Sequence, residues 1–237
     1  MEENIKSKFL FLHGYAQNSQ IFNLRTKNLQ KQLLKKFNNK YEILIPDAPL
    51  ILDKDNQIQE NEILRGWLTF DKVDDFYGRK LIKYYGLSEA IDNIYKLGDN
   101  NKNIEMILSF SQGSVVLILM IILSLYNNDK YNFNQHFPNL KCIICVSGFI
   151  RPFPDNDEFK DIIDEVFSEK ETNIKKCQIP ILNVYGENDQ FVLNDKSQEI
   201  SKFFTYSEDF CHKGKHFVPS SKGDIIKFEE FLEKYLK

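Results

Sequence analysis

The segment that most constrains the fold is IEMILSFSQGSVVLILMIIL, residues 104–123. A short apolar run ends near Ser111, and a longer apolar run begins after Gly113. A buried strand and a buried helix have these lengths, so the segment predicts a strand that turns sharply into a helix. The apolar stretch Val115 to Leu123 is about half of the roughly 20 residues needed to cross a bilayer, so we expect no membrane span.

Short apolar runs alternate with longer amphipathic stretches along the whole chain, which is typical of βαβ units that build a mostly parallel sheet. Several runs are apolar without alternation, as in strands covered on both faces. We expect six strands, over residues 8–13, 41–46, 105–110, 141–147, 180–185 and 204–211. Ser88 can cap a helix that stops near Gly98, and residues 224–235 repeat the helical pattern. The predicted fold class is α/β, with a mostly parallel central sheet and helices on both faces.

The length of 237 residues suits one sizeable core, so we predict a single domain over residues 1–237. Stretches at about 50–86 and 151–178 do not fit the alternation, and we interpret them as insertions that border the site. The net charge is only −3, and no long basic stripe argues for a nucleic-acid partner. The first apolar run, Phe9 to Leu12, is too short for a signal-peptide core, which favours a cytoplasmic protein. The sequence does not indicate an oligomeric state.

Four cysteines are present, and two of them, Cys142 and Cys145, lie in the strand-like run CIICVSG. Positions three apart on a strand face opposite ways, which suits neither a zinc knuckle nor a redox pair. No other His and Cys spacing is typical of a metal site. We therefore expect reduced thiols, no metal and no organic cofactor.

Ser111 occupies the bend between the predicted strand and helix. A tight turn of this kind lifts a hydroxyl above the sheet, and the small Gly113 lets the backbone double back beside it. Ser109 would still lie in the strand and Ser114 in the first helical turn, so Ser111 is the candidate nucleophile. The alternative is that Ser111 only caps the helix, as serine often does.

The run FLFLHGYAQN predicts a strand that ends in His-Gly and opens into a loop. A backbone N–H from Tyr15 or Ala16, between which the sequence does not decide, can pair with the N–H of Gln112 to bind an oxyanion. His13 is expected to fix this loop by a hydrogen bond rather than to carry a proton. Because it borders the predicted site, His13 is also a candidate substrate contact.

The run ILNVYGENDQFV predicts an apolar strand followed by a turn that carries Asp189. An acid on such a turn can orient a catalytic histidine. Asp195 is the rival, but Asp195 with Gln198 three residues later has the pattern of a helix capping box. Asp189 is therefore the candidate acid.

The chain order serine, acid, histidine leaves His212 and His216 as candidate bases. His212 is predicted to end a strand. His216 lies in GKHFVP, where Gly214 permits a loop, and a loop position lets the imidazole lean across the sheet edge toward Ser111. His216 is therefore the candidate base.

The motifs LHGYAQN, IPDAPL, RGWLTF, FSQG, VSGF, VYGENDQFV and HKGKHFVP together resemble the FSH family of serine hydrolases. The match covers nearly the whole chain, and the order and spacing of the motifs are more specific than any one of them. The resemblance implies an α/β-hydrolase with Ser111, Asp189 and His216 as its triad. It also implies esterase or thioesterase activity on a small-molecule ester.

The same motifs are similar to those of acyl-protein thioesterases and other small carboxylesterases, so the subfamily stays open. A binding protein that kept the fold without catalysis is a further alternative. The resemblance also implies that Arg65 and Trp67 approach the site, with Trp67 a candidate substrate contact. Aromatic residues between 50 and 86 favour uncharged, apolar acyl groups.

The sequence departs from the family pattern G-x-S-x-G at one position, because Ser109 replaces the first glycine. The extra side chain occupies the inside of the bend. It either crowds the turn or is tolerated there, with its hydroxyl bonded to nearby backbone.

Overall fold

The computed structural model describes residues 6–52, 63–74, 80–150 and 174–236, together with residues 159, 165 and 166. Its centre is a six-stranded sheet with the order β10-β9-β8-β7-β1-β2, and all neighbouring strands are parallel. The strands are β1 (Ser7–Leu12), β2 (Tyr41–Leu44), β7 (Ile104–Phe110), β8 (Cys142–Val146), β9 (Ile181–Gly186) and β10 (Ser207–His212).

All six predicted strands are confirmed, with the boundaries of two corrected. The strand predicted over 41–46 ends at Leu44. The last strand begins at Ser207 and not at residue 204. Phe204 makes only an isolated bridge to Cys177, and a bend separates it from β10.

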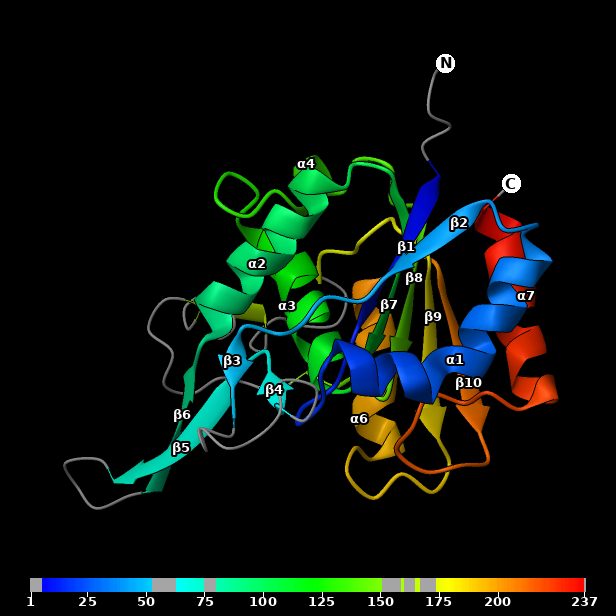
Figure 1. The fold of residues 1–237 in the computed structure, drawn as a ribbon. Coiled ribbons are helices and arrows are strands. Elements are labelled where there is room, and N and C mark those ends of the chain that lie inside the picture. The colour runs from blue at the N-terminus through cyan, green and yellow to red at the C-terminus, as the bar shows by residue number, and fades with distance from the viewer. Residues whose placement is uncertain are drawn as a thin grey trace.

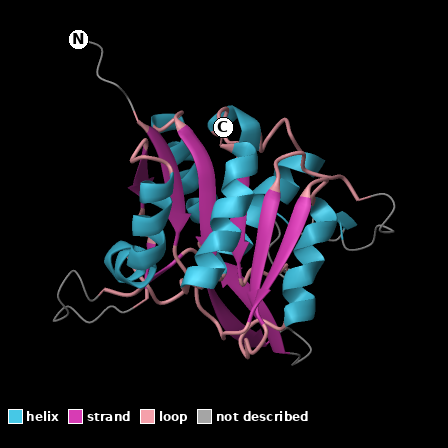
Figure 2. Cartoon of the chain, turned by 90° about the vertical axis from the view of Figure 1, so that its right-hand side faces the viewer, coloured by secondary structure: helices cyan, strands magenta, loops and turns pink. Residues whose placement is uncertain are grey.

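Helices cover both faces of the sheet (Figure 1). One face carries α1 (Ser19–Lys36) and α7 (Lys222–Tyr235). Figure 2 shows strands with helices on either side of them. The other face carries α2 (Leu87–Asn100), α3 (Gln112–Tyr126) and the short α4 (Phe133–His136). Two short elements follow β9, namely α6 (Asn194–Gln198) and the 3₁₀ helix η3 (Glu199–Phe203).

The sheet is buried on both faces, and the residues of β1 alternate between the cores on the two faces. Leu10 and Leu12 belong to the core under α2 and α3. Phe9 and Phe11 point the other way, into the core under α1 and α7. This double burial explains why the central strands are apolar without alternation. The helix α3 is apolar on all sides because it is almost wholly enclosed.

The starts of two helices, α7 and α2, differ from the predictions. Ser221 and Asp224 form a reciprocal capping box that starts α7 ahead of the predicted residue 224. The predicted cap of α2 is wrong, since the helix begins at Leu87 behind Gly86, which has φ 82°. Glycine adopts that left-handed conformation at little cost, so Ser88 lies inside the first turn.

The first predicted insertion, at about 50–86, contains two small antiparallel pairs. These are β3 (Leu50–Ile51) with β4 (Arg65–Gly66), and β5 (Thr69–Asp74) with β6 (Lys80–Tyr85). The β5 and β6 pair projects from the body of the molecule (Figure 1). Most of the second, at about 151–178, lies outside the described residues. In the described part of the chain, no helix has the length and apolarity to cross a bilayer.

Candidate active site

Ser111 lies at the sharp turn between β7 and α3, at the carboxyl edge of the sheet. Its backbone has φ 50° and ψ −114°, a strained conformation for a residue with a side chain. Its N–H donates to the carbonyl oxygen of Val146 over 2.9 Å, which ties the turn to β8. Gly113 permits the close turn, because a Cβ there would lie 2.6 Å from the carbonyl oxygen of His13.

Three predicted residues from distant parts of the chain meet above this edge. The Ser111 hydroxyl donates to His216 Nε2 over 2.9 Å. His216 Nδ1–H donates to Asp189 Oδ2 over 2.7 Å. The loop that carries His216 lies against the end of β9, where a Cβ on Gly186 would be 2.5 Å from the carbonyl oxygen of Lys215. The candidate nucleophile, base and orienting acid are thus in hydrogen-bonding order.

The Asp189 carboxylate is held by the backbone as well as by the histidine. Its Oδ1 accepts hydrogen bonds from the N–H groups of Phe191 and Val192, at 2.9 and 3.0 Å. Burial on its own raises the pKa of Asp189, but the bonds from Val192 and His216 outweigh burial and lower the pKa below its ordinary value. An ionised Asp189 can fix the tautomer and orientation of His216.

The rival acid, Asp195, is exposed in the first turn of α6. The predicted capping box of Asp195 with Gln198 is wrong, because the helix is preceded by Leu193 and has no side-chain cap. The helix starts one residue ahead of Asp195, which therefore lies inside the turn.

The other rivals are buried and paired elsewhere. His212 ends β10, and its Nδ1 accepts from the N–H of Gly214 over 3.1 Å. Burial lowers the pKa of His212, which favours the neutral ring. The buried Ser114 hydroxyl donates to Ser109 Oγ over 3.0 Å. Burial also raises the pKa of the neighbouring Cys145 thiol to about 12, so it is no competing nucleophile.

The loop after β1 passes close to the turn at Ser111, since a Cβ on Gly14 would lie 3.4 Å from Ser111 Cβ. The N–H of Gly14 is engaged by the side-chain oxygen of Gln17 at 3.3 Å. The N–H groups of Tyr15, Ala16 and Gln112 donate to no other described residue. Ala16 has φ 53°, so the loop is strained where it passes the turn. Both predicted alternatives, Tyr15 and Ala16, keep a free donor for an oxyanion.

His13 and Trp67 have no exposed surface, so the prediction that they contact substrate is wrong. The Nδ1–H of His13 donates to the carbonyl oxygen of Gly14 over 2.8 Å, and its Nε2 accepts from the N–H of Ala48. Burial lowers the pKa of His13, which suits a neutral ring with both nitrogens paired. The indole N–H of Trp67 donates to the His13 carbonyl over 2.7 Å. Both residues lie behind the loop and hold it in place.

The side chain of Gln112 has a role that the sequence analysis missed. Its Oε1 accepts from the N–H of Trp67 over 2.7 Å, and its Nε2 donates to the carbonyl oxygen of Leu68 over 2.8 Å. The residue after Ser111 thus fastens the first insertion to the turn. Nearby, the N–H of Arg65 donates to the carbonyl oxygen of Gln17 over 2.8 Å.

Aromatic rings around His216 were also missed. The ring centroid of Phe110, the residue before Ser111, lies 4.9 Å from that of His216. Phe191, two residues after Asp189, lies 5.3 Å from it and is 85% exposed. Phe110 belongs to the FSQG motif and Phe191 to VYGENDQFV. An aromatic residue at a strand end or in a turn, however, does not by itself indicate a contact with a histidine ring.

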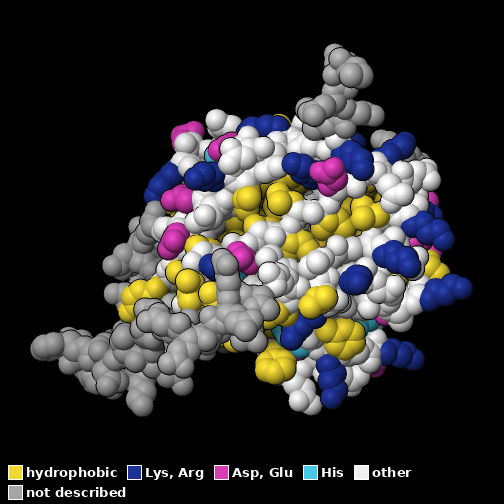
Figure 3. Space-filling model, in the orientation of Figure 1, with side chains coloured by type: hydrophobic (Ala, Val, Ile, Leu, Met, Phe, Trp, Pro, Cys, Tyr) yellow, Lys and Arg dark blue, Asp and Glu magenta, His cyan; other side chains and the backbone are white. Residues whose placement is uncertain are grey.

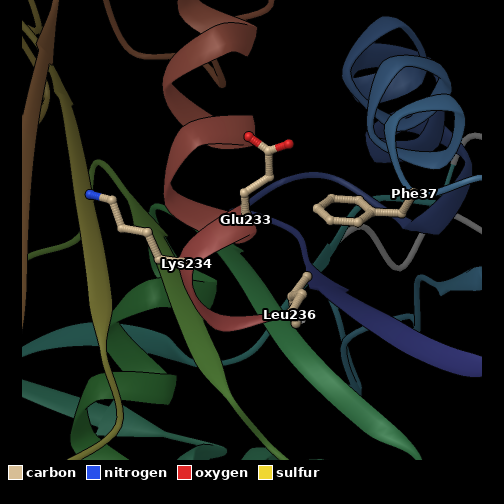
Figure 4. A pocket seen from close by; sticks show the side chains of 4 residues that line it. All are labelled: Phe37, Glu233, Lys234 and Leu236. Carbon is tan, nitrogen blue, oxygen red and sulfur yellow. The ribbon is translucent and has the colours of Figure 1, made fainter.

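One surface hollow lies away from this chemistry. A hollow of about 510 Å³ lies between Phe37 at the end of α1 and Glu233, Lys234 and Leu236 at the end of α7 (Figure 4). It has neither histidine nor hydroxyl in its lining. A smaller cavity, of about 320 Å³, is lined by His216 itself. The chemistry of the side chains, and not the size of the hollow, identifies the site.

A parallel sheet flanked by helices, with a serine at a strand-to-helix turn and an acid and a histidine on neighbouring strand ends, defines an α/β-hydrolase. The chain belongs to the serine hydrolase (FSH1) family, whose model matches residues 1–228. It is 24% identical over 238 residues to esterase OVCA2 of Xenopus tropicalis, covering 97% of this chain and 93% of that protein. It is 27% identical over 232 residues to family of serine hydrolases 3 of Saccharomyces cerevisiae, covering 92% and 80%.

Solved structures share the fold. SOBER1 of Arabidopsis thaliana superposes with a TM-score of 0.61 at 17% identity, covering 98% of this chain and all of that one. Acyl-protein thioesterase 2 of Zea mays gives a TM-score of 0.59 at 15% identity, covering 100% and 96%. At these identities the likeness concerns the architecture alone.

Proposed function

We propose that this serine hydrolase cleaves carboxylic esters through a covalent acyl-enzyme on Ser111, with His216 as base and Asp189 as its orienting acid. The observation that carries the proposal is the unbroken relay of hydrogen bonds, 2.9 Å from Ser111 Oγ to His216 Nε2 and 2.7 Å from His216 Nδ1 to Asp189 Oδ2. A protein that only bound ligands would have no need of a strained serine in this relay.

The reaction follows from these contacts in two halves. His216 takes the Ser111 proton as Oγ bonds to the ester carbonyl carbon, and the resulting imidazolium gives that proton to the leaving alcohol as the C–O bond breaks. Water then attacks the acyl-enzyme with His216 again as base. The carboxylic acid leaves, and Ser111 recovers its proton. Asp189 stays ionised and stabilises the imidazolium.

The negative charge on the carbonyl oxygen needs donors during both halves. The N–H of Gln112, directly after Ser111, and that of Tyr15 or Ala16, in the loop after β1, have no other acceptor among the described residues. Each such donor is worth roughly 3 kcal/mol of barrier. The loop held by His13 and Trp67 therefore matters to the rate although neither side chain touches substrate.

The substrate we propose has an uncharged, apolar acyl group. Three aromatic side chains near the loops of the site are well exposed, namely Tyr15 at 46%, Phe191 at 85% and Phe217 at 47%. Exposed aromatic surface beside a nucleophile favours apolar ligands. Each buried methylene adds up to about 0.8 kcal/mol of binding, so longer chains should be preferred until the available surface is covered.

The test is a panel of p-nitrophenyl esters of graded acyl length, with matched thioesters of the same acids. We expect kcat/KM to rise with chain length and then to fall, and Ser111→Ala to abolish turnover of every substrate. A thioester preference would place the protein with acyl-protein thioesterases. Wild-type protein that hydrolyses no member of the panel would support the non-catalytic alternative.

A further inference from the structure

The cavity beside His216 is walled by aromatic and aliphatic side chains and has one charge. It lies between the first half of α1 and the loop that carries His216. Its apolar lining comes from Phe22, Phe110, Phe217 and Val218. Figure 3 shows hydrophobic side chains beside the cyan of histidine low on this face, with basic side chains next to them.

The charge in the cavity is the guanidinium of Arg25. Arg25 follows Phe22 by three positions on α1, so the two side chains share a face of the helix. It forms no hydrogen bond or ion pair with any other residue that the structure describes, and none of the lining residues is acidic. A guanidinium beside apolar surface and without a counter-ion is suited to bind a carboxylate through two parallel hydrogen bonds.

The position of His216 determines which part of an ester substrate can enter this cavity. In the proposed reaction the imidazolium must reach the leaving oxygen, so the leaving alcohol has to lie within hydrogen-bonding distance of His216 Nε2. A cavity with His216 in its wall is therefore placed to receive what is attached to that oxygen. Ser220, which also lines the cavity, is tied to α1, because Asn28 Nδ2 donates to its carbonyl oxygen over 2.8 Å.

We propose that this cavity is the leaving-group subsite and that Arg25 selects esters whose alcohol carries a carboxylate beyond a short apolar spacer. The volume of about 320 Å³ lies at the small end of ligand pockets and suits an alcohol of this kind. The inference rests on the proposed function, because it needs Ser111 and His216 to process the ester.

The test uses esters of one fixed fatty acid with ω-hydroxycarboxylic acids of graded spacer length. The matched neutral substrates are the corresponding ω-hydroxyamides, which have the same size and no charge. We expect wild-type kcat/KM to favour the carboxylate over the amide by about five- to tenfold at one spacer length, since an arginine partly open to water is screened.

Arg25→Gln should reduce that ratio to about one, and Arg25→Lys should restore part of it. The matched control is Lys27→Gln, which removes the same charge from an exposed position of α1 and should keep the wild-type ratio. A wild-type ratio of one, or a preference that survives in Arg25→Gln, would overturn the proposal. So would a preference for a carboxylate on the acyl side, in monoesters of dicarboxylic acids.

A second measurement separates this inference from the proposed function. The Ser111→Ala variant should bind the free ω-hydroxycarboxylate more tightly than the ω-hydroxyamide, as followed by calorimetric titration, and Arg25→Gln in that background should remove the difference. If no ester is hydrolysed but this difference holds, the hydrolase proposal fails and the anion site stands. If esters are hydrolysed without any difference in binding or rate, the anion site fails alone.

Discussion

At the scale of single residues, the turn at Ser111 contains buried polar side chains that are paired with one another. Ser109 is an example, because it replaces a family glycine inside the turn. Its hydroxyl accepts a hydrogen bond from Ser114 over 3.0 Å and lies 3.5 Å from the carbonyl oxygen of Ile144. The Ser109 side chain is fully buried, and polar contacts accommodate it. This agrees with the expectation that the turn tolerates a serine at this position.

Gln112 offers a prediction at this scale. Gln112→Leu leaves the N–H of Trp67 and the carbonyl oxygen of Leu68 without their partners, and a buried unpaired group costs about 1–3 kcal/mol. We expect chemical unfolding to show a loss of that size and turnover to fall as the turn loosens. Gln20→Ala, at an exposed position of α1, is the control and should match the wild type. Unchanged stability in Gln112→Leu would mean that the first insertion is held by other contacts.

The buried histidines predict how stability depends on pH. Burial lowers the pKa of both His13 and His212 in the folded chain, whereas an unfolded histidine titrates near 6.5. Below about pH 6.5 the unfolded chain therefore binds more protons than the folded one. The free energy of unfolding should have its highest value, as far as these histidines contribute, above that pH. It should fall as the pH drops toward the pKa values of the folded chain.

His212→Asn separates the two contributions, because an asparagine oxygen can replace Nδ1 as the acceptor for Gly214 but does not titrate in this range. Urea unfolding at pH 7.5 and 5.5 should show a smaller pH-dependent loss in the variant than in the wild type. An equal loss in both would show that His212 contributes nothing to the acid sensitivity.

Residue roles could be predicted where they follow from position along the chain. Ser111, Asp189 and His216 were predicted because each stands at a turn after a strand, and the structure brings them together. The hydrogen bond between the Gln112 side chain and the N–H of Trp67 could not be predicted, since Trp67 lies 45 residues away in an irregular stretch. The burial of Trp67 behind the loop, and not in the site, depends on the same tertiary packing.

At the scale of elements, burial on both faces made the strands easy to predict and left their ends uncertain. The run at 204–211 has apolar residues on both sides of the bend at residues 205 and 206. The sequence therefore could not show that its first residues lie outside the strand. The start of α2 depends on the left-handed backbone of Gly86, for which the sequence offers only the glycine itself. For α1 we predicted no range, although Asn18 caps it by accepting from the N–H of Ile21 over 2.8 Å.

The capping box of α7 supplies an element-scale prediction. Ser221→Ala removes the acceptor for the N–H of Asp224, which should lower the free energy of unfolding by about 1 kcal/mol. Lys222→Ala, at the next position, leaves the box intact and should have a smaller effect. Urea titrations of both variants measure the two losses of stability. If the two lose equal stability, helix propensity and not the cap governs this end of α7.

At the scale of the whole molecule, parallel strands bring distant parts of the chain to one edge. The residues proposed for catalysis follow β7, β9 and β10, and the candidate oxyanion loop follows β1. The start of β1 and the end of α7 lie at the opposite side of the molecule (Figure 1). Order along the chain and strand ends together thus determine where the site lies, whereas the substrate depends on side chains that line the loops.

The central claim is that Ser111 is an activated nucleophile, and covalent labelling with a fluorophosphonate tests it most directly. The tryptic peptide 103–130 holds four serines, so fragment spectra must locate the adduct. We predict one adduct per chain, on Ser111, with none in Ser111→Ala, strongly slowed labelling in His216→Gln and native labelling in Ser114→Ala. An adduct on Ser109 or Ser114, or a wild-type protein that does not react, would contradict the account.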